Sequence, residues 1–113
     1  MKVLVVGCSG FVGNFIMKTL ARAHPEVAVI GMSRSGRARE PETASLPNVS
    51  YVQGDCLEPE SFREHLEDVD SVIHTVGTLI EKRGNPKLSY QAMNRDAAMN
   101  VAAELQDFAE AKR

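Results

Sequence analysis

The sequence lacks the features that mark several classes of protein. Its 113 residues carry a formal net charge of −2, which argues against a protein that binds nucleic acid through its overall charge. No apolar run approaches the roughly 20 residues that a bilayer-spanning helix requires. The two cysteines, Cys8 and Cys56, lack a C-x-x-C spacing, and the three histidines are scattered. We therefore expect buried thiols rather than a disulfide or a zinc site.

Length and patterning predict one α/β domain over residues 1–113. Met1 and Lys2 lead directly into a strand-like run, so no targeting segment is readable there. Apolar and polar segments alternate as strands and helices do, which predicts a parallel sheet with right-handed crossovers. The expected strands are residues 2–6, 27–31, 49–53 and 71–76. The expected helices run from residue 10 to about 22, from residue 58, and from about 89 to 112, and residues 33–48 are expected to form a loop.

Apolar spacing indicates which face of each helix is buried. The first helix is expected to end at His24, because the residue before Pro25 is pushed out of the helical region. The expected buried residues are Phe11, Val12, Phe15, Ile16 and Leu20 in the first helix, Phe62, Leu66 and Val69 in the second, and Met93, Ala97, Val101, Leu105 and Phe108 in the third.

Three glycines, Gly7, Gly10 and Gly13, follow the first strand and open the first helix. Glycine is favoured where the backbone turns sharply or another group approaches closely. A glycine-rich turn between a buried strand and a helix N-terminus holds the pyrophosphate in dinucleotide-binding folds. We assign the tight turn to Gly7, the close approach to Gly10 and helix–strand packing to Gly13. The spacing is G-x-x-G-x-x-G rather than G-x-G-x-x-G, and the alternative is that the glycines serve packing alone.

The segment GCSGFVG at 7–13 resembles the pattern of extended and atypical short-chain dehydrogenase/reductases. Residues 54–62 (GDCLEPESF), 68–77 (DVDSVIHTVG) and 94–105 (NRDAAMNVAAEL) agree with that family in the same order. The resemblance implies a Rossmann-like three-layer fold with a parallel sheet in the order 3-2-1-4. It also implies that residues 1–113 are the N-terminal half of a larger doubly wound, NAD(P)-binding domain.

Two segments resemble one subgroup of this family. Residues 33–38 (SRSGRA) and 72–81 (VIHTVGTLIE) are most similar to atypical members associated with mitochondrial coenzyme Q biosynthesis in fungi. The accessory dinucleotide-binding subunit of respiratory complex I is a more distant relative. The resemblance therefore implies a mitochondrial protein whose partners are quinone-biosynthesis proteins or a mitochondrial complex.

The resemblance also assigns cofactor contacts. Asp55 matches an acid near the adenine, with Cys56 supplying a backbone contact, and the alternative for Asp55 is a helix cap or turn acid. Thr75 and the two residues after it match the stretch beneath the cofactor's ribose. The expected cofactor-binding residues are Gly7, Ser9, Gly10, Phe11, Val12, Gly13, Ser33, Arg34, Asp55, Cys56, Thr75, Val76 and Gly77.

The end of the second strand bears on the choice of cofactor. NAD-binding members place an acid there to hold the ribose 2′-OH. This chain has Ser33 and Arg34, with Arg37 and Arg39 nearby and no acid before Glu40. Arginine suits a 2′-phosphate through paired hydrogen bonds, so we expect NADP in preference to NAD. The alternative is a solvated basic loop.

No catalytic residue is assigned. Reductases of this superfamily use Tyr-x-x-x-Lys, in which the lysine lowers the pKa of the tyrosine. Asp55 stands four residues after Tyr51 and Asn94 four after Tyr90, so the pair is absent from these 113 residues. His74 is expected to be a hydrogen-bonded core histidine. Asn94 matches an asparagine that opens a helix in extended members, or simply starts a helix.

Three functions remain open. The first is an NAD(P)-dependent oxidoreductase, or its N-terminal part, acting on a quinone-pathway intermediate. The second is a non-catalytic dinucleotide-binding subunit that stabilises a mitochondrial complex, and the third is an NADP-binding redox sensor. We also expect self-association, because the fourth strand is apolar and carries no lysine or proline to guard an open edge.

Overall fold

The computed structural model describes residues 1–75 and 96–111. In this part of the chain, four parallel strands form one sheet in the order β3-β2-β1-β4. The α/β fold and the strand order predicted from the sequence are thus confirmed. The strands are β1 (Lys2–Val6), β2 (Ala28–Ser33), β3 (Val49–Gln53) and β4 (Ser71–His74). The helices are α1 (Phe11–Ala23), α2 (Pro41–Ala44), α3 (Pro59–Phe62), the 3-10 helix η1 (Arg63–Leu66) and α4 (Ala97–Ala111).

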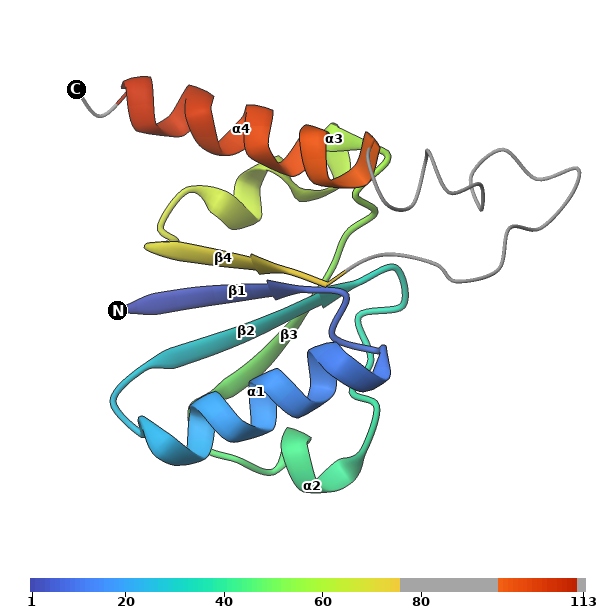
Figure 1. Cartoon of the computed structure of the whole chain (residues 1–113), viewed down its shortest axis with the longest axis vertical. Coiled ribbons are helices and arrows are strands. Elements are labelled where there is room, and N and C mark those ends of the chain that lie inside the picture. Colours follow the sequence, from blue (N-terminus) through green and yellow to red (C-terminus); the bar gives the residue numbers. More distant parts are fainter. Residues whose placement is uncertain (76–95, 112–113) are drawn as a thin grey trace, which may run out of the picture.

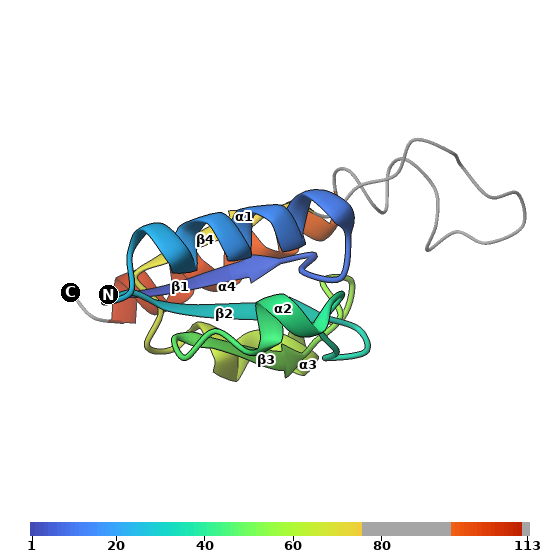
Figure 2. The ribbon, with the colours of Figure 1, turned by 90° about the horizontal axis from the view of Figure 1, so that it is seen from below.

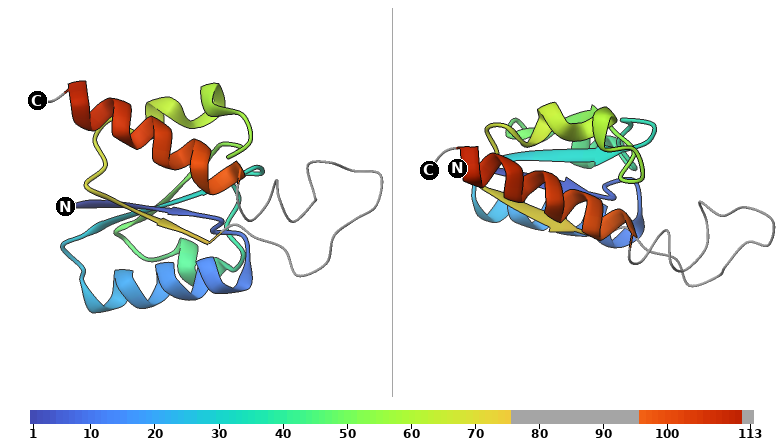
Figure 3. Two further views of the ribbon diagram at one scale, coloured as in Figure 1. Left: turned by 45° about the horizontal axis from the view of Figure 1, so that its top comes forward. Right: turned by 90° about the horizontal axis from the view of Figure 1, so that it is seen from above.

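Helices cover both faces of the sheet (Figure 1). α1 and α2 lie on one face, seen from their side in Figure 2, while α3, η1 and α4 lie on the other, as both views of Figure 3 show. Each face has its own core. Leu4 and Val6 of β1 pack with Phe62, whereas Val3 and Val5 pack with α1. Successive strand residues point to opposite faces, so the unbroken apolar run of β1 is buried on both.

The buried face of α1 differs from the predicted one. Phe11, Val12 and Phe15 are 74%, 59% and 59% exposed, and Ile16 and Leu20 are only partly buried. The prediction that the first three belong to the buried stripe was wrong. Gly13 packs directly onto the β1–α1 turn, so its side of the helix faces inward. The buried residues of α1 are Gly13, Asn14, Met17 and Ala21.

Several element boundaries also differ from the prediction. β4 ends at His74, two residues before the predicted end at 76. α2 lies in the segment expected to be a loop, and Pro41 is its first residue, a position where proline is favoured because the missing N–H is not needed. β2 continues to Ser33, two residues beyond the predicted end at 31. The helix expected from residue 58 is a short α3 followed by η1, with Phe62 and Leu66 buried as predicted.

α4 covers β1 and β4 on the second face. Ala97 and Val101 are buried, and Leu105 packs against the same core, which confirms that part of the predicted stripe. The predicted helix start near residue 89 and Met93 lie outside the described residues, as does the side chain of Phe108. None of the described helices has the length and apolar character needed to cross a bilayer.

Polar contacts fasten α4 to the neighbouring helices. Arg63 of η1 donates two hydrogen bonds to the Glu104 carboxylate, of 2.8 and 3.2 Å. Glu104 is nearly buried, and this contact lowers the pKa of its carboxyl. The Asn100 amide donates to the Cys56 carbonyl oxygen at 2.9 Å. These contacts hold α4 against the loop that follows β3.

Candidate functional site

The turn between β1 and α1 carries the first group of predicted site residues. Gly7 has a φ of 92°, a conformation that disfavours any residue with a Cβ. Its N–H donates to the Met32 carbonyl oxygen at 2.9 Å, and the Gly10 N–H donates to the Gly7 carbonyl oxygen at 3.1 Å. Gly7 therefore makes the sharp bend that brings the chain from β1 into α1.

Gly13 lies where α1 passes closest to this turn. A Cβ at this position would stand 2.2 Å from the Gly7 carbonyl oxygen and 2.9 Å from Thr75 Oγ1. Both distances are shorter than non-bonded atoms allow, so only glycine fits. The Thr75 hydroxyl donates to the Val6 carbonyl oxygen at 2.7 Å, and its N–H donates to the same oxygen at 2.9 Å. Thr75 thus links the end of β4 to the turn.

Gly10 differs from the other two glycines. Its φ of −79° suits any residue, and the nearest atom to an added Cβ would be the Gly7 carbonyl oxygen at 3.4 Å, an ordinary contact. Nothing in the described part of the chain requires glycine at this position. The absent side chain leaves open space at the surface, next to the exposed residues Ser9, Phe11 and Val12.

The N-terminal end of α1 opens onto this space. Gly10 is the N-cap and supplies no side-chain hydrogen bond, and the first turn holds no acidic residue. The first N–H groups of a helix have no partner within it and carry the positive end of the helix dipole. This end of α1 can therefore accept an anionic group. Figure 1 shows it at the same end of the sheet as the arrowheads of the strands.

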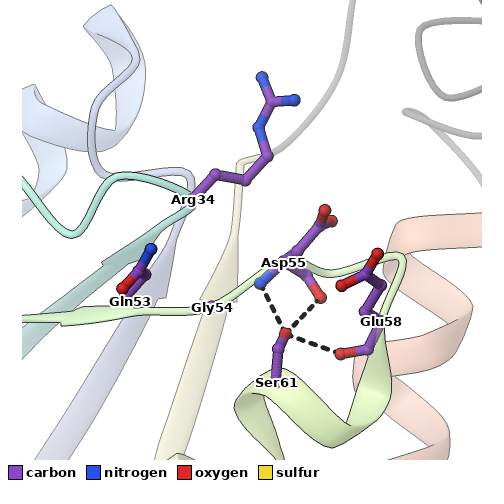
Figure 4. Close-up of a pocket in the computed structure, with 6 residues that line it drawn as sticks. All are labelled: Arg34, Gln53, Gly54, Asp55, Glu58 and Ser61. Atoms are coloured by element: carbon purple, nitrogen blue, oxygen red, sulfur yellow. Dashed lines mark hydrogen bonds between the residues drawn. The ribbon is translucent and has the colours of Figure 1, made fainter.

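A pocket of about 310 Å³ lies at the carboxyl ends of β2 and β3. Arg34 follows β2 directly, and no described residue pairs with its exposed guanidinium. In Figure 4 the side chains of Arg34 and Asp55 extend toward the same open side of the pocket. The residues that line it are Arg34, Gln53, Gly54, Asp55, Glu58 and Ser61. Only the folded turn brings the other lining residues beside Arg34, so Gln53, Gly54, Glu58 and Ser61 were not predicted.

Asp55 organises the turn that follows β3. Its Oδ1 accepts the Leu57 N–H at 2.9 Å, and its own N–H donates to Ser61 Oγ at 2.8 Å. The Ser61 hydroxyl lies 3.0 Å from the Asp55 carbonyl oxygen and 2.7 Å from that of Glu58. This is the turn role held open as an alternative. Since no described residue bonds Oδ2, the same carboxylate retains an oxygen for a ligand.

The loop after β2 is shaped by its own polar groups. Ser33 is 8% exposed, and its Oγ accepts the Gly36 N–H at 3.0 Å. Gly36 has a φ of 68°, which favours glycine. The Ser33 side chain therefore supports the loop, and its contact with a cofactor stays a prediction. Burial raises the pKa of the neighbouring Cys8 thiol, and a hydrogen bond with Ser33 opposes that shift.

Glu40, the first acid after β2, is bound to the helices. Its Oε1 accepts hydrogen bonds from Lys18 Nζ at 2.8 Å, Thr43 Oγ1 at 3.0 Å and Asn14 Nδ2 at 3.2 Å. These donors lower the pKa of Glu40 to about 2. The carboxylate joins α1 to α2 and does not occupy the ribose position at the end of β2.

Arg39 connects this loop to the glycine turn. Its Nη1 donates to the Ser9 carbonyl oxygen at 3.0 Å, and its guanidinium carbon lies 5.8 Å from the centre of the Phe11 ring. The sequence placed Arg39 only near the end of β2. The contact joins residues 30 positions apart and has no signal in local spacing.

The remaining predicted residues have mixed outcomes. Cys56 is a buried free thiol, as is Cys8 on the other face of the sheet. Burial, followed by the charge of Asp55, raises the pKa of Cys56 to about 11.

His74 was expected to be hydrogen-bonded, but no described residue bonds either ring nitrogen, and burial lowers its pKa. Val76, Gly77 and Asn94 lie outside the described residues. In the described part, no group of three or more His, Cys, Asp or Glu could hold a metal ion.

The sequence of this chain matches one known protein family. Residues 4–103 match the 3-beta hydroxysteroid dehydrogenase/isomerase family. The chain belongs to this family. Membership in it confirms the resemblance to extended short-chain dehydrogenase/reductases. The match includes both the glycine turn and the pocket-lining residues.

Two relatives with similar sequences carry different names. The isoflavone reductase homolog A622 of Nicotiana tabacum is 32% identical over 67% of this chain and 26% of its own length. MIOREX complex component 2 of Saccharomyces cerevisiae is 23% identical over 89% of this chain and 48% of its own length. The chain therefore spans less than half the length of these two relatives.

Solved structures show the same fold. Yeast methylglyoxal/isovaleraldehyde reductase Gre2, complexed with NADPH, is 18% identical with a TM-score of 0.72, over 96% of this chain and 33% of its own. UDP-glucuronic acid 4-epimerase from Bacillus cereus, in complex with NAD, is 19% identical with a TM-score of 0.76, over 95% of this chain and 36% of its own. At these identities the likeness shows the fold alone.

Proposed function

We propose that this chain binds a nicotinamide dinucleotide across the carboxyl ends of β1, β2 and β3, and that it prefers NADP(H). Gly10 carries the proposal, because no described contact requires glycine there while the helix end beside it is open to an anion. In this arrangement the pyrophosphate lies against the N–H groups of residues 10–13. The adenosine half lies toward the pocket at Arg34 and Asp55. The nicotinamide cofactors in Gre2 and the epimerase support the choice of ligand.

The preference for NADP(H) rests on the end of β2. Arg34 lines the pocket with a guanidinium that no described residue pairs with. Glu40, the first acid after the strand, is already bound by three donors. A 2′-phosphate would pair with Arg34 through charge-assisted hydrogen bonds. Among the described residues, no carboxylate directly follows β2 to hold a bare ribose hydroxyl; the acids of the pocket, Asp55 and Glu58, follow β3.

The test is to replace Arg34 and measure both cofactors by calorimetry. A charge-assisted pair is worth about 1.5–3 kcal/mol, so Arg34→Ala should weaken NADPH binding roughly tenfold or more. NADH binding should change little, and the difference should shrink at high salt. Arg22→Ala removes an exposed arginine at the far end of α1 and is the control. Equal losses of NADPH and NADH in Arg34→Ala would rule out the phosphate contact.

The proposed binding serves an oxidoreductase of the quinone pathway, as the resemblance of residues 33–38 and 72–81 to the coenzyme Q members suggests. Tyr51 and Tyr90 each lack the lysine that would complete the family's proton donor. We therefore expect these 113 residues to bind NADPH without oxidising it. An assay of NADPH oxidation with short-chain quinones checks this, and turnover would mean that other residues donate the proton.

A second candidate function is supported by the likeness to MIOREX complex component 2. Its name describes a part of a complex, which favours a dinucleotide-binding subunit of an assembly, mitochondrial as the resemblance implies. The test is to tag the chain in its own cells, isolate mitochondria and follow the tag by sedimentation. Sedimentation of the tagged chain with a large assembly supports this role. A tag found outside mitochondria, or one that sediments as a small particle, contradicts it.

A further inference from the structure

We propose that Arg39 is a positioning residue that holds the glycine turn in the shape that receives the dinucleotide; this inference rests on the proposed function. Its Nη1 donates to the carbonyl oxygen of Ser9 at 3.0 Å. Its guanidinium lies over the ring of Phe11, 5.8 Å from the ring centre. Ser9 and Phe11 stand on either side of Gly10, so one side chain contacts the turn on both flanks of the open position.

Arg39 is itself held in place by its neighbour. The Glu40 carboxylate accepts hydrogen bonds from Asn14 and Lys18 of α1 and from Thr43 of α2. The backbone at residue 40 is therefore tied to α1, and Arg39 reaches the glycine turn from a fixed point. Together these contacts make a closed connection from α1, through residues 39 and 40, back to the start of α1.

The exposure of Phe11 fits this role. The ring is 74% exposed and belongs to neither core of the sheet. A cation over an aromatic face is attracted by the ring's electrons, so the ring gives Arg39 a surface against which to rest. We infer that Phe11 serves as the platform for Arg39, which explains an exposed aromatic residue that the core does not use.

The expected consequence differs from that of Arg34. A turn already held in its binding shape loses less conformational freedom when the ligand arrives. The pyrophosphate is common to NADPH and NADH, so loss of Arg39 should weaken both by the same factor. Arg34 lines the pocket at the adenosine end, and its loss should discriminate between them.

Arg37 provides the matched control for charge. It is exposed and lies in the same loop. Its backbone N–H donates to Ser35 Oγ at 3.2 Å, and no described residue hydrogen-bonds to its side chain. Arg37→Met and Arg39→Met each remove one positive charge from the loop, but only the second removes the contacts with Ser9 and Phe11. The difference between the two variants therefore isolates those contacts.

The experiment titrates NADPH and NADH into the full chain and its variants by calorimetry, at low and at high salt. Arg39→Met should weaken both cofactors about fivefold relative to Arg37→Met, since an exposed cation–π contact with one charged hydrogen bond is worth a modest factor. This ratio should persist at high salt. Phe11→Leu, which changes no charge, should also weaken both, and the double variant Phe11→Leu with Arg39→Met should be weaker by less than the product of the two effects. Circular dichroism confirms that each variant is folded.

Each outcome decides the proposal. Equal losses for the two cofactors, together with coupling to Phe11, support a positioning role. A loss confined to NADPH would show that Arg39 contacts the 2′-phosphate, and a loss equal to that of Arg37→Met would show that only charge matters; either would overturn the proposal. If the unmodified chain bound neither cofactor, the proposed function itself would fail, and this is seen before any variant is compared.

Discussion

The two regions of the candidate site are built by different means. In the glycine turn, backbone constraints determine the sequence, since Gly7 needs a positive φ and Gly13 has no room for a Cβ. The pocket at the ends of β2 and β3 depends instead on side chains, since no described residue pairs with Arg34 and Asp55 holds its own turn. Changes in the turn should therefore affect the fold or every dinucleotide, while changes in the pocket should affect the choice between dinucleotides.

The largest effect is expected at Gly13. In Gly13→Ala the Cβ would meet the Gly7 carbonyl oxygen at 2.2 Å, and the helix must move away from the turn. Overpacking of this kind typically costs about 1–3 kcal/mol and occasionally more, so urea unfolding should show a large loss of stability. Stability close to that of the unmodified chain would mean that α1 does not pack on the turn as described.

Gly10→Val should separate binding from folding. The backbone at this position suits any residue, and the nearest protein atom lies 3.4 Å from the added Cβ, so the loss of stability should be about 1 kcal/mol or less. The side chain would fill the space proposed for the pyrophosphate, so calorimetry should detect neither NADPH nor NADH binding. Binding at the original strength would mean that the glycine turn serves packing alone.

A third prediction concerns β4, which lies outside both regions. In the described part of the chain β4 pairs with β1 alone, and Val72 and Ile73 are only partly buried. An apolar edge without a charged residue invites pairing with another chain. Light scattering should show self-association, and Ser71→Lys, which adds a charge at an exposed strand position, should reduce it. A monomer at all concentrations would contradict this expectation.

The smallest effect is expected from the link between the two regions. The pKa of Glu40 is lowered from 4.5 to about 2, so its ionised form stabilises the fold above pH 4.5, and that contribution disappears as the pH falls toward 2. Urea midpoints of the unmodified chain and of Glu40→Gln should differ at pH 6, and the difference should shrink below pH 4.5 and disappear only as the pH approaches 2. A difference that stays constant over this range would show that the carboxylate charge contributes nothing.

Patterns within short stretches of the sequence predicted the sheet and the glycine turn of this molecule. The alternation of apolar segments predicted a parallel α/β sheet, the family resemblance implied its strand order, and the position of the glycines between β1 and α1 indicated the turn. Residues 41–44 were missed because Pro41 was interpreted as a loop residue, although proline also begins helices. The predicted buried face of α1 was wrong. Phe11 and Phe15 are apolar at helical spacing and were assigned to the core, but it is Gly13 that packs on the turn.

The contacts between the two regions could not be predicted. Arg39 reaches Ser9, and Glu40 reaches Asn14 and Lys18, across 22 to 30 positions of sequence. Such pairs depend on where the loop after β2 returns over α1, and no periodic pattern encodes that path. The sequence thus indicated some of the residues around the candidate site, Arg34 and Asp55 among them, but not how its two regions are joined.

The most direct test of one continuous dinucleotide site is a two-dimensional amide NMR titration of the chain with NADPH. We predict shifts in both regions at once, in the amides of residues 9–13 and in those of Arg34, Gly54 and Asp55. With NADH the turn should respond in the same way while the Arg34 amide moves less. Shifts confined to one region, or found only elsewhere in the molecule, would contradict the proposal that the turn and the pocket hold the two parts of one cofactor.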